Sequence, residues 1–286
     1  MPVSAENVNN LHKYEIKILK TIEYLHRRFQ WIPYDNIKSS TGFSDGELKF
    51  RIGHLLNMDM IRSQSAPYDA YSLSYTGYDS LALISLKKKG TVHSLGQMFA
   101  VGKESEVYEA IGVGMLVIKF HHIGQHSFQS VRRNRAYLPY EKHCPWVYAS
   151  HLSARQEYDV IDILKEKVKV PLPVGINRSA LVESMVMGVN LHQARLEDPE
   201  TVLDMIISEV KKTYELDVIH ADLSEYNIMI DEDGEITLID WPQWIPVSHP
   251  NANEILKRDL DNVVNYFRRK YGIERQVGDI LSQVVG

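Results

Sequence analysis

The stretch that decides the fold lies at residues 219–240. Residues 219–230 read IHADLSEYNIMI, and residues 236–240 read ITLID. Asp222 stands five residues before Asn227, and a short apolar run that predicts a strand follows at once. The turn sequence DEDG at 231–234 returns the chain through a second predicted strand that ends at Asp240. This hairpin would set Asp240 beside Asn227, and we predict that it builds a metal site.

Asp222, Asn227 and Asp240 carry the oxygen atoms that phosphoryl transfer requires. Carboxylate and amide oxygens suit Mg²⁺ or Mn²⁺, so we predict that Asn227 and Asp240 bind the metal. Asp222 is the predicted catalytic residue that orients an attacking hydroxyl and receives its proton. His220 is expected to brace the loop. The alternative is an Asp and an Asn that merely flank a buried hairpin, and this motif alone leaves that alternative open.

A lysine strand upstream strengthens the phosphoryl-transfer hypothesis. Residues 101–110, VGKESEVYEA, predict a strand, a turn and a returning strand, and residues 116–120, LVIKF, predict a third strand that contains Lys119. A lysine within an apolar strand is costly unless it is paired. The expected partners of Lys119 are nucleotide phosphates and Glu157, in the helical run 154–161. Taken alone, Lys119 is also compatible with an ordinary lysine whose charged end reaches water.

The predicted nucleotide site comprises a loop, a lysine strand and a hinge between two lobes. Only Gly102 stands where a Gly-x-Gly-x-x-Gly pattern would be expected, so backbone N–H groups and the Ser105 hydroxyl are expected to replace glycine contacts. Backbone groups of the hinge would bond adenine, and Met229 or Ile230 would floor the pocket. The predicted ATP-binding residues are Gly102, Lys103, Glu104, Ser105, Val107, Lys119, Glu157, Glu183, Ser184, Met185, Val186, Met229 and Ile230.

These motifs resemble those of protein kinases, with His-Ala-Asp at 220–222 in place of His-Arg-Asp and Ile-Asp-Trp at 239–241 in place of the Asp-Phe-Gly segment. No Ala-Pro-Glu segment follows, and 46 residues remain after Asp240, so the kinase is trimmed. Residues 96–280 resemble the RIO family of atypical protein kinases through GKES at 102–105, DLSEYN at 222–227 and IDWPQ at 239–243. Ala221 and Trp241 depart from the more usual glycine and phenylalanine of that family.

The N-terminal third predicts a winged helix. A long helix carries an apolar stripe at Leu11, Ile16, Leu19, Ile22, Tyr24 and Leu25. A short helix starts at Pro33, and a second helix begins at Ser44 with Glu47 as its capping-box partner. That second helix would turn Leu48, Ile52, Leu55 and Leu56 inward and expose Lys49 and Arg51. Strands near 60–62 and 71–73 and a helix from Thr76 complete the pattern, which resembles the second, winged-helix-bearing RIO subfamily of archaeal type.

The predicted fold class is α+β, with a winged helix followed by a trimmed, two-lobed kinase-like domain. We place the winged helix at 1–90 and the kinase domain at 91–286, with an N-lobe of about 91–183 and a C-lobe of about 187–286. Residues 1–95 carry a net charge of +3 and the remainder −8. We predict that Lys49 and Arg51 contact RNA, although an ordinary solvated surface explains so small a charge equally well.

Composition narrows the class of protein. The single cysteine, Cys144, excludes an internal disulfide and favours a reducing compartment. No apolar run approaches the roughly 20 residues that span a bilayer, so we expect a cytoplasmic protein with no membrane partner. The polar segment 124–151 reads as a loop, in which the family resemblance makes Ser127 and Ser130 candidate autophosphorylation sites. The resemblance also suggests Asp240 as a phosphate acceptor. A polar loop without phosphate is the alternative.

Two functional hypotheses follow. The first is an ATP- and Mg²⁺-dependent serine/threonine protein kinase or ATPase that phosphorylates itself. The family resemblance implies a role in maturation of the small ribosomal subunit, with its precursor and RNA as partners. The second is a nucleotide-switched RNA-binding factor with little protein kinase activity. A winged-helix transcription regulator with a decayed kinase is disfavoured, because Lys119, Asp222, Asn227 and Asp240 are all present.

Overall fold

A computed structural model describes residues 2–124 and 145–286 of the chain. It divides into two compact units, residues 1–155 with 174–182 and residues 156–173 with 183–286. Helices and strands occur in both units, in keeping with the predicted α+β class. The candidate phosphate acceptors Ser127 and Ser130, and Cys144, lie outside the described residues.

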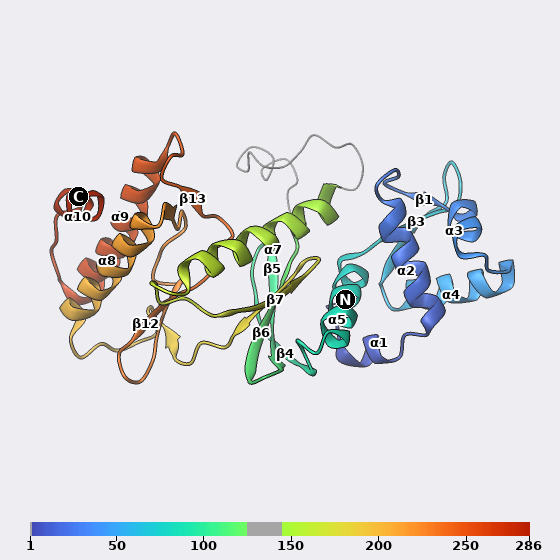
Figure 1. Ribbon diagram of the computed structural model, residues 1–286, viewed down its shortest axis with the longest axis horizontal. Coiled ribbons are helices and arrows are strands. Elements are labelled where there is room, and N and C mark those ends of the chain that lie inside the picture. The colour runs from blue at the N-terminus through green and yellow to red at the C-terminus, as the bar shows by residue number, and fades with distance from the viewer. Residues whose placement is uncertain (1, 125–144) are drawn as a thin grey trace. The chain divides into compact units, whose positions relative to one another are not determined.

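The first unit begins with the winged helix (Figure 1). Its elements are α1 (Ala5–Asn9), α2 (Lys13–Leu25), β1 (Ile32–Pro33), α3 (Tyr34–Thr41), α4 (Asp45–Asn57), β2 (Ile61–Gln64), β3 (Ala70–Leu73) and α5 (Tyr75–Lys88). The three strands form an antiparallel sheet in the order β1-β3-β2. The β2–β3 hairpin is the wing. The core of the winged-helix domain is apolar and includes Ile18, Leu19, Ile22, Leu48, Leu55 and Met60.

Three details of the winged helix differ from the sequence-based expectation. Tyr24 is 61% exposed rather than buried, and Ile18 takes the inward position on α2. The full capping box lies at the start of α2, where His12 and Glu15 bond each other's backbone N–H groups. Ser44 does accept the Glu47 N–H, at 3.3 Å, but the Glu47 side chain bonds Arg51 instead of returning to the cap.

A five-stranded sheet follows, in the order β4-β5-β6-β8-β7. Its strands are β4 (Ser94–Val101), β5 (Ser105–Ile111), β6 (Met115–His121), β7 (Pro173–Asn177) and β8 (Ala180–Ser184). β5 and β6 pair antiparallel, with Val107 opposite Lys119. The long helix α7 (Pro145–Leu164) includes residues 145–151, which the sequence analysis assigned to a polar loop. Aromatic side chains within that segment explain the helix, because Trp146 packs against Tyr75 and Tyr78.

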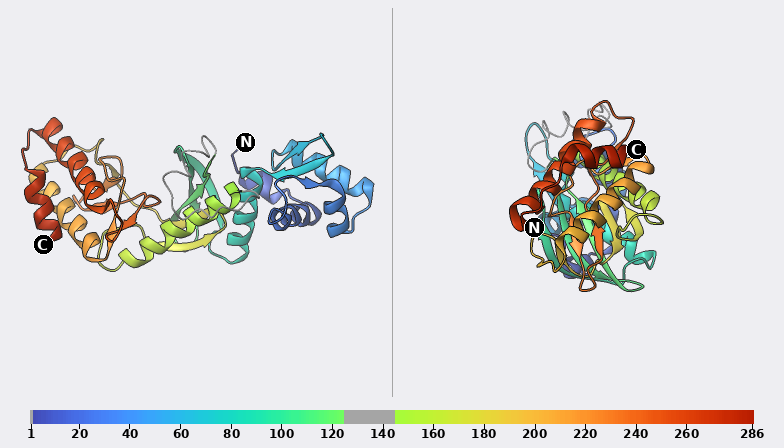
Figure 2. Two further views of the ribbon diagram at one scale, coloured as in Figure 1. Left: turned by 90° about the horizontal axis from the view of Figure 1, so that it is seen from above. Right: turned by 90° about the vertical axis from the view of Figure 1, so that its left-hand side faces the viewer.

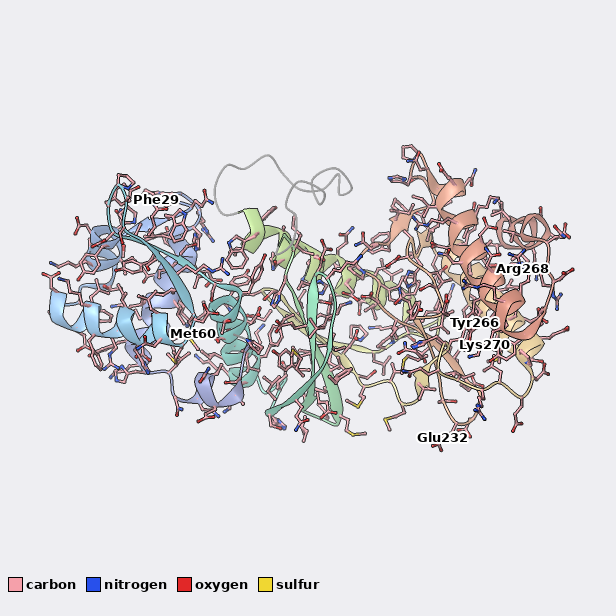
Figure 3. The ribbon with its side chains drawn as sticks, turned by 180° about the vertical axis from the view of Figure 1, so that it is seen from behind. Phe29, Met60, Glu232, Tyr266, Arg268 and Lys270 are labelled. Carbon is pink, nitrogen blue, oxygen red and sulfur yellow. The ribbon has the colours of Figure 1, made fainter. Side chains whose placement is uncertain are left out.

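The second unit holds the hairpin and three packed helices (Figure 2). Its elements are β9 (Val189–Asn190), α8 (Pro199–Glu215), β10 (Val218–Ile219), β11 (Ile228–Ile230), β12 (Ile236–Leu238), β13 (Ile245–Pro246), α9 (Ala252–Tyr271) and α10 (Val277–Val285). One sheet has the order β12-β11-β9, and β10 pairs with β13. Figure 3 places Glu232 at the outer end of the β11–β12 turn, and Tyr266, Arg268 and Lys270 on α9. Among the described helices, none combines the length and apolar character needed to cross a bilayer.

Candidate active site

The predicted hairpin forms in the second unit. Ile228 lies opposite Leu238, and the Ile239 N–H donates to the Asn227 carbonyl at 3.0 Å. This register carries Asp240 out of the end of β12 next to the start of β11. Asp240 itself has a φ of 69°, in the left-handed region that aspartate tolerates better than most residues. The backbone therefore turns sharply at the predicted metal ligand.

Asn227 is held in one orientation. Its Nδ2 donates to the Asp222 carbonyl at 2.8 Å, and its backbone N–H donates to the Ser224 carbonyl at 3.0 Å. Because the amide nitrogen is committed to Asp222, the amide oxygen is the atom left to face a cation. An amide oxygen and the Asp240 carboxylate are hard donors, and Mg²⁺ is commonly held by one or two such protein ligands together with phosphates and water. The residues present therefore fit a magnesium ion.

His220 braces the catalytic loop, as the sequence analysis expected. Its Nδ1 accepts the Asp222 N–H at 3.3 Å, which makes Nε2 the protonated nitrogen that donates to the Ile239 carbonyl at 3.0 Å. The ring also packs against Trp241, with centroids 4.4 Å apart. One buried imidazole thus ties the residue before the metal ligand to the predicted catalytic aspartate.

Asp259 on α9 is a site residue that the sequence analysis missed. Its Oδ2 accepts the Ala221 N–H at 2.7 Å, and its carboxylate also accepts from the backbone of Leu223. Burial raises the pKa of Asp259 to about 6, although the neighbouring Arg258 guanidinium and these amides oppose the rise. Ala221 has a φ of 65°, so the carboxylate holds a strained turn just before Asp222. A charged residue at a buried position of amphipathic α9 was the signal that could have identified it.

Glu157 fixes the segment that follows Asp240. Its side chain is 1% exposed, and Oε1 accepts the Trp241 N–H at 3.1 Å. Trp241 is fully buried and donates through its indole nitrogen to the Leu238 carbonyl at 3.1 Å. The indole that departs from the more usual phenylalanine therefore has a hydrogen-bond partner. The pairing of Glu157 with Lys119 stays a prediction.

In the first unit, Lys119 is 6% exposed on β6. The predicted nucleotide loop, residues 102–105, joins β4 to β5, and the Gly102 N–H donates to the Ser105 carbonyl at 2.8 Å. The loop residues Lys103, Glu104 and Val107 lie at or beside this turn.

The predicted hinge lies in the second unit. Ser184 bonds Leu172 there through both its N–H, at 2.9 Å, and its hydroxyl, at 2.8 Å. These bonds leave the predicted adenine contacts to Met185 and Val186. Glu183 ends the same strand, β8, while Met229 and Ile230 lie in β11. The ATP-binding roles of all these residues remain predictions.

The predicted RNA-binding pair on α4 differs in exposure. Lys49 is exposed, as expected. The Arg51 side chain is only 19% exposed, because Nε bonds Glu47 at 2.8 Å and Nη1 bonds the buried Glu15 at 3.3 Å. The expectation that both side chains are exposed is therefore wrong for Arg51, which helps to hold α4 against α2.

The chain matches two family models. Residues 105–280 match the RIO domain, and residues 8–89 match the Rio2 N-terminal domain. The RIO-type serine/threonine-protein kinase Rio2 of Methanocaldococcus jannaschii is 37% identical over 258 residues, which cover 87% of this chain and 94% of that protein. The serine/threonine-protein kinase rio2 of Schizosaccharomyces pombe is 32% identical over 263 residues, covering 90% of this chain and 76% of that protein.

Solved structures agree. The Rio2 kinase of Chaetomium thermophilum superimposes with a TM-score of 0.84 at 26% sequence identity, covering 98% of this chain and 88% of that one. Its ADP/Mg²⁺-phosphoaspartate complex gives a TM-score of 0.83 with the same identity and coverage. Both domains of the chain thus match those of one group of kinases. The chain belongs to the RIO family of atypical serine/threonine-protein kinases, in the Rio2 branch that carries an N-terminal winged helix.

Proposed function

We propose that this kinase uses Mg-ATP to phosphorylate its own Asp240, and that the resulting nucleotide cycle acts in maturation of the small ribosomal subunit. The observation that carries the proposal is the geometry around Asp240. Asp240 follows β12 and has a left-handed backbone conformation. It lies next to Asn227, whose side-chain amide is oriented by its bond to the Asp222 carbonyl. The Rio2 kinase of C. thermophilum, crystallised with ADP, Mg²⁺ and a phosphoaspartate, supports both the cofactors and the acceptor.

The transfer to aspartate needs no proton acceptor. A carboxylate oxygen of Asp240 forms a bond to the γ-phosphorus while the bond to the β–γ bridging oxygen breaks, which yields ADP and an acyl phosphate. A bound Mg²⁺ supplies neutralisation of the triphosphate charge. Water must then attack the acyl phosphate, and Asp222 is the base that we assign to this water. For transfer to a serine, Asp222 would instead accept the hydroxyl proton.

The short connection after Asp240 favours a switch over phosphorylation of extended peptides. Residues 241–251 alone separate Asp240 from α9, which leaves little chain for a peptide-binding platform. The same observation supports the alternative function, a nucleotide-switched assembly factor with little protein kinase activity. The family resemblance and the winged helix support the small ribosomal subunit precursor as the partner in both cases.

The chemical nature of the phosphorylated residue tests the proposal. The parent protein, incubated with Mg²⁺ and ATP labelled at the γ-phosphate, should carry label that hydroxylamine removes, because hydroxylamine cleaves acyl phosphates but not serine phosphates. Asp240→Asn should abolish this label. Ser127→Ala with Ser130→Ala is the control and should retain it. Label that resists hydroxylamine and survives in Asp240→Asn would contradict phosphorylation of Asp240.

The ribosomal role requires a separate measurement. ATP turnover by the parent should change when purified precursor particles of the small subunit are added, whereas mature subunits serve as the control. An identical turnover with and without precursor particles would contradict that role while leaving the chemistry of Asp240 untouched.

A further inference from the structure

One face of α2 carries a row of lysines. Lys13, Lys17 and Lys20 recur at i, i+4 and i+7, so the helical period brings them to the same side. All three are exposed. Tyr24 continues the row one turn later, and its side chain is 61% exposed. We refer to Lys13, Lys17 and Lys20 as the lysine face.

The charge of the lysine face is not neutralised. Within residues 2–124 and 145–286, no carboxylate forms an ion pair with any of the three lysines. The two acidic residues of α2 itself are bound elsewhere. Glu15 is fully buried and bonds Arg51 and His54. Glu23 is bonded by Nε and Nη2 of Arg178, at 2.7 and 2.8 Å.

The lysine face borders an open hollow of about 540 Å³ that Thr21, Tyr24 and Ser40 also line. Lys17 is held in place there, since its Nζ donates to the Thr41 carbonyl at 2.7 Å. This bond also offsets the partial negative charge at the C-terminal end of α3. The ammonium group keeps further donors for an anion. Hydroxyl groups and an exposed aromatic ring thus surround a preset positive charge.

In this chain α4, the helix that corresponds to the recognition helix of winged-helix proteins, offers few free positive charges to an anion. On α4, the Arg51 guanidinium is bonded by Glu47 and Glu15. At its N-terminal end, Asp45 bonds Lys38 at 2.9 Å. Lys49 remains as an exposed cation beside the acidic first turn. The positive charge available to a polyanion is therefore concentrated on α2 rather than on α4.

We propose that the lysine face of α2 binds the phosphate backbone of RNA, with Tyr24 stacking on a base. Lysines attract phosphates without regard to sequence, and exposed aromatic rings stack on unpaired bases. The Arg27 guanidinium lies over the Tyr24 ring, with Cζ 5.2 Å from the ring centroid, and adds a cation to that platform. The inference refines the RNA partner of the proposed function by naming its binding surface.

Binding of a labelled single-stranded RNA to the full chain, titrated at several salt concentrations, tests the proposal. Replacing all three lysines of the lysine face by Gln should weaken binding at least about tenfold and lower the slope of log affinity against log salt by about two units. The matched control is the Gln replacement of Lys87, Lys88 and Lys89, three exposed lysines at the end of α5 in the same unit. It removes equal charge and should leave the salt slope unchanged.

Two further variants guard against loss of folding. The three lysines replaced by Arg keep the charge and should bind like the parent. Lys13→Gln with Lys20→Gln spares the Lys17 bond to α3. This variant should lower the salt slope by about two thirds as much as the triple Gln variant does.

Several results would overturn the proposal. The first is a Gln variant of the lysine face that binds RNA as tightly as the parent does. The second is an α5 control that loses as much RNA affinity as that variant. The third is a parent protein that binds vesicles containing phosphatidylglycerol but does not bind RNA. ATP turnover stimulated by precursor particles is measured on the same variants. If the Gln variant of the lysine face loses RNA binding but is still stimulated by precursor particles, the lysine face is not the surface that the particles use. The proposed function would stand in that case.

Discussion

Each unit of the molecule buries an ionisable side chain that accepts a hydrogen bond from a backbone amide. In the winged helix, His26 Nε2 accepts the Leu73 N–H at 3.1 Å, while Nδ1 lies 3.2 Å from the Phe29 carbonyl. In the second unit, Asp259 accepts the Ala221 N–H at 2.7 Å. Burial favours the uncharged form of both groups, so it lowers the pKa of His26 to about 4 and raises that of Asp259 to about 6.

The two side chains differ in the location of the backbone amide that each one binds. The amide held by His26 lies in β3 of an apolar domain, so the bond serves stability alone. The amide held by Asp259 belongs to Ala221, next to the predicted catalytic residue Asp222, so we expect this bond to position that residue as well. The same physical device should therefore give a purely thermodynamic effect in one unit and a kinetic one in the other.

Asp222→Asn should separate catalysis from stability most clearly. The amide keeps the shape of the carboxylate but cannot accept a proton, so steady-state ATP turnover should fall by about two to four orders of magnitude. The acyl phosphate at Asp240 should accumulate, because its formation requires no base. Turnover and the hydroxylamine-sensitive label are measured together, and unfolding by denaturant should match the parent. Turnover at the parental rate would show that Asp222 is not the base.

His26 should give the winged helix a stability that depends on pH. Because the folded state lowers its pKa from 6.5 to about 4, the unfolded state binds more protons in this range. The stabilisation is fully present above pH 6.5 and declines as the pH falls towards 4, by about 3 kcal/mol in total. Exchange of the Leu73 amide at several pH values should show this decline in the parent and not in His26→Gln. Parallel profiles for the two proteins would count against it.

Asp259 should contribute in the opposite sense. A carboxyl whose pKa rises from 3.8 to about 6 on folding adds stability below 3.8, which is lost as the pH rises through 6. Near neutral pH, Asp259→Asn should lower ATP turnover about tenfold, because one amide oxygen cannot accept all the bonds that the carboxylate takes from Ala221, Leu223 and Arg258. Amide exchange at Ala221 should increase, whereas exchange at Leu73 should not. An unchanged turnover with faster exchange at Ala221 would reduce Asp259 to a stabilising residue.

Arg51→Gln should have the smallest effect. Glu15 keeps its bonds to the His12 N–H and to His54, so we expect only a small loss of winged-helix stability. Denaturation followed through amides of α2 and α4 measures it, with Lys49→Gln as the exposed control. RNA affinity should be the same in both variants if α2 holds the RNA. A large loss of affinity in Arg51→Gln alone would return the binding surface to α4.

Local patterns in the sequence predicted the parts of the site that depend on neighbouring residues. The hairpin, the turn at 231–234 and the placement of Asp240 follow from spacing and alternation within some twenty residues. The bracing by His220 was also expected, because the histidine lies two residues from Asp222.

Contacts between distant segments were not predictable in the same way. Asp259 reaches Ala221 across 38 residues of sequence, and Arg51 reaches Glu15 across 36. Spacing on α4 placed Arg51 outward, but packing against α2 gave it a buried partner, Glu15. The aromatic contacts of Trp146 likewise made a helix of residues that composition alone assigned to a loop.

Trp241 gives the molecule a natural optical probe of its predicted catalytic centre. The indole is fully buried, stacks near His220 and donates to the Leu238 carbonyl, while its own amide is held by Glu157. Its fluorescence therefore depends on the residue next to Asp240 and on the loop that carries Asp222. Replacing Trp31, Trp146 and Trp244 by Phe would leave Trp241 as the single tryptophan, whose emission would follow loading and release at this centre in real time without any added label.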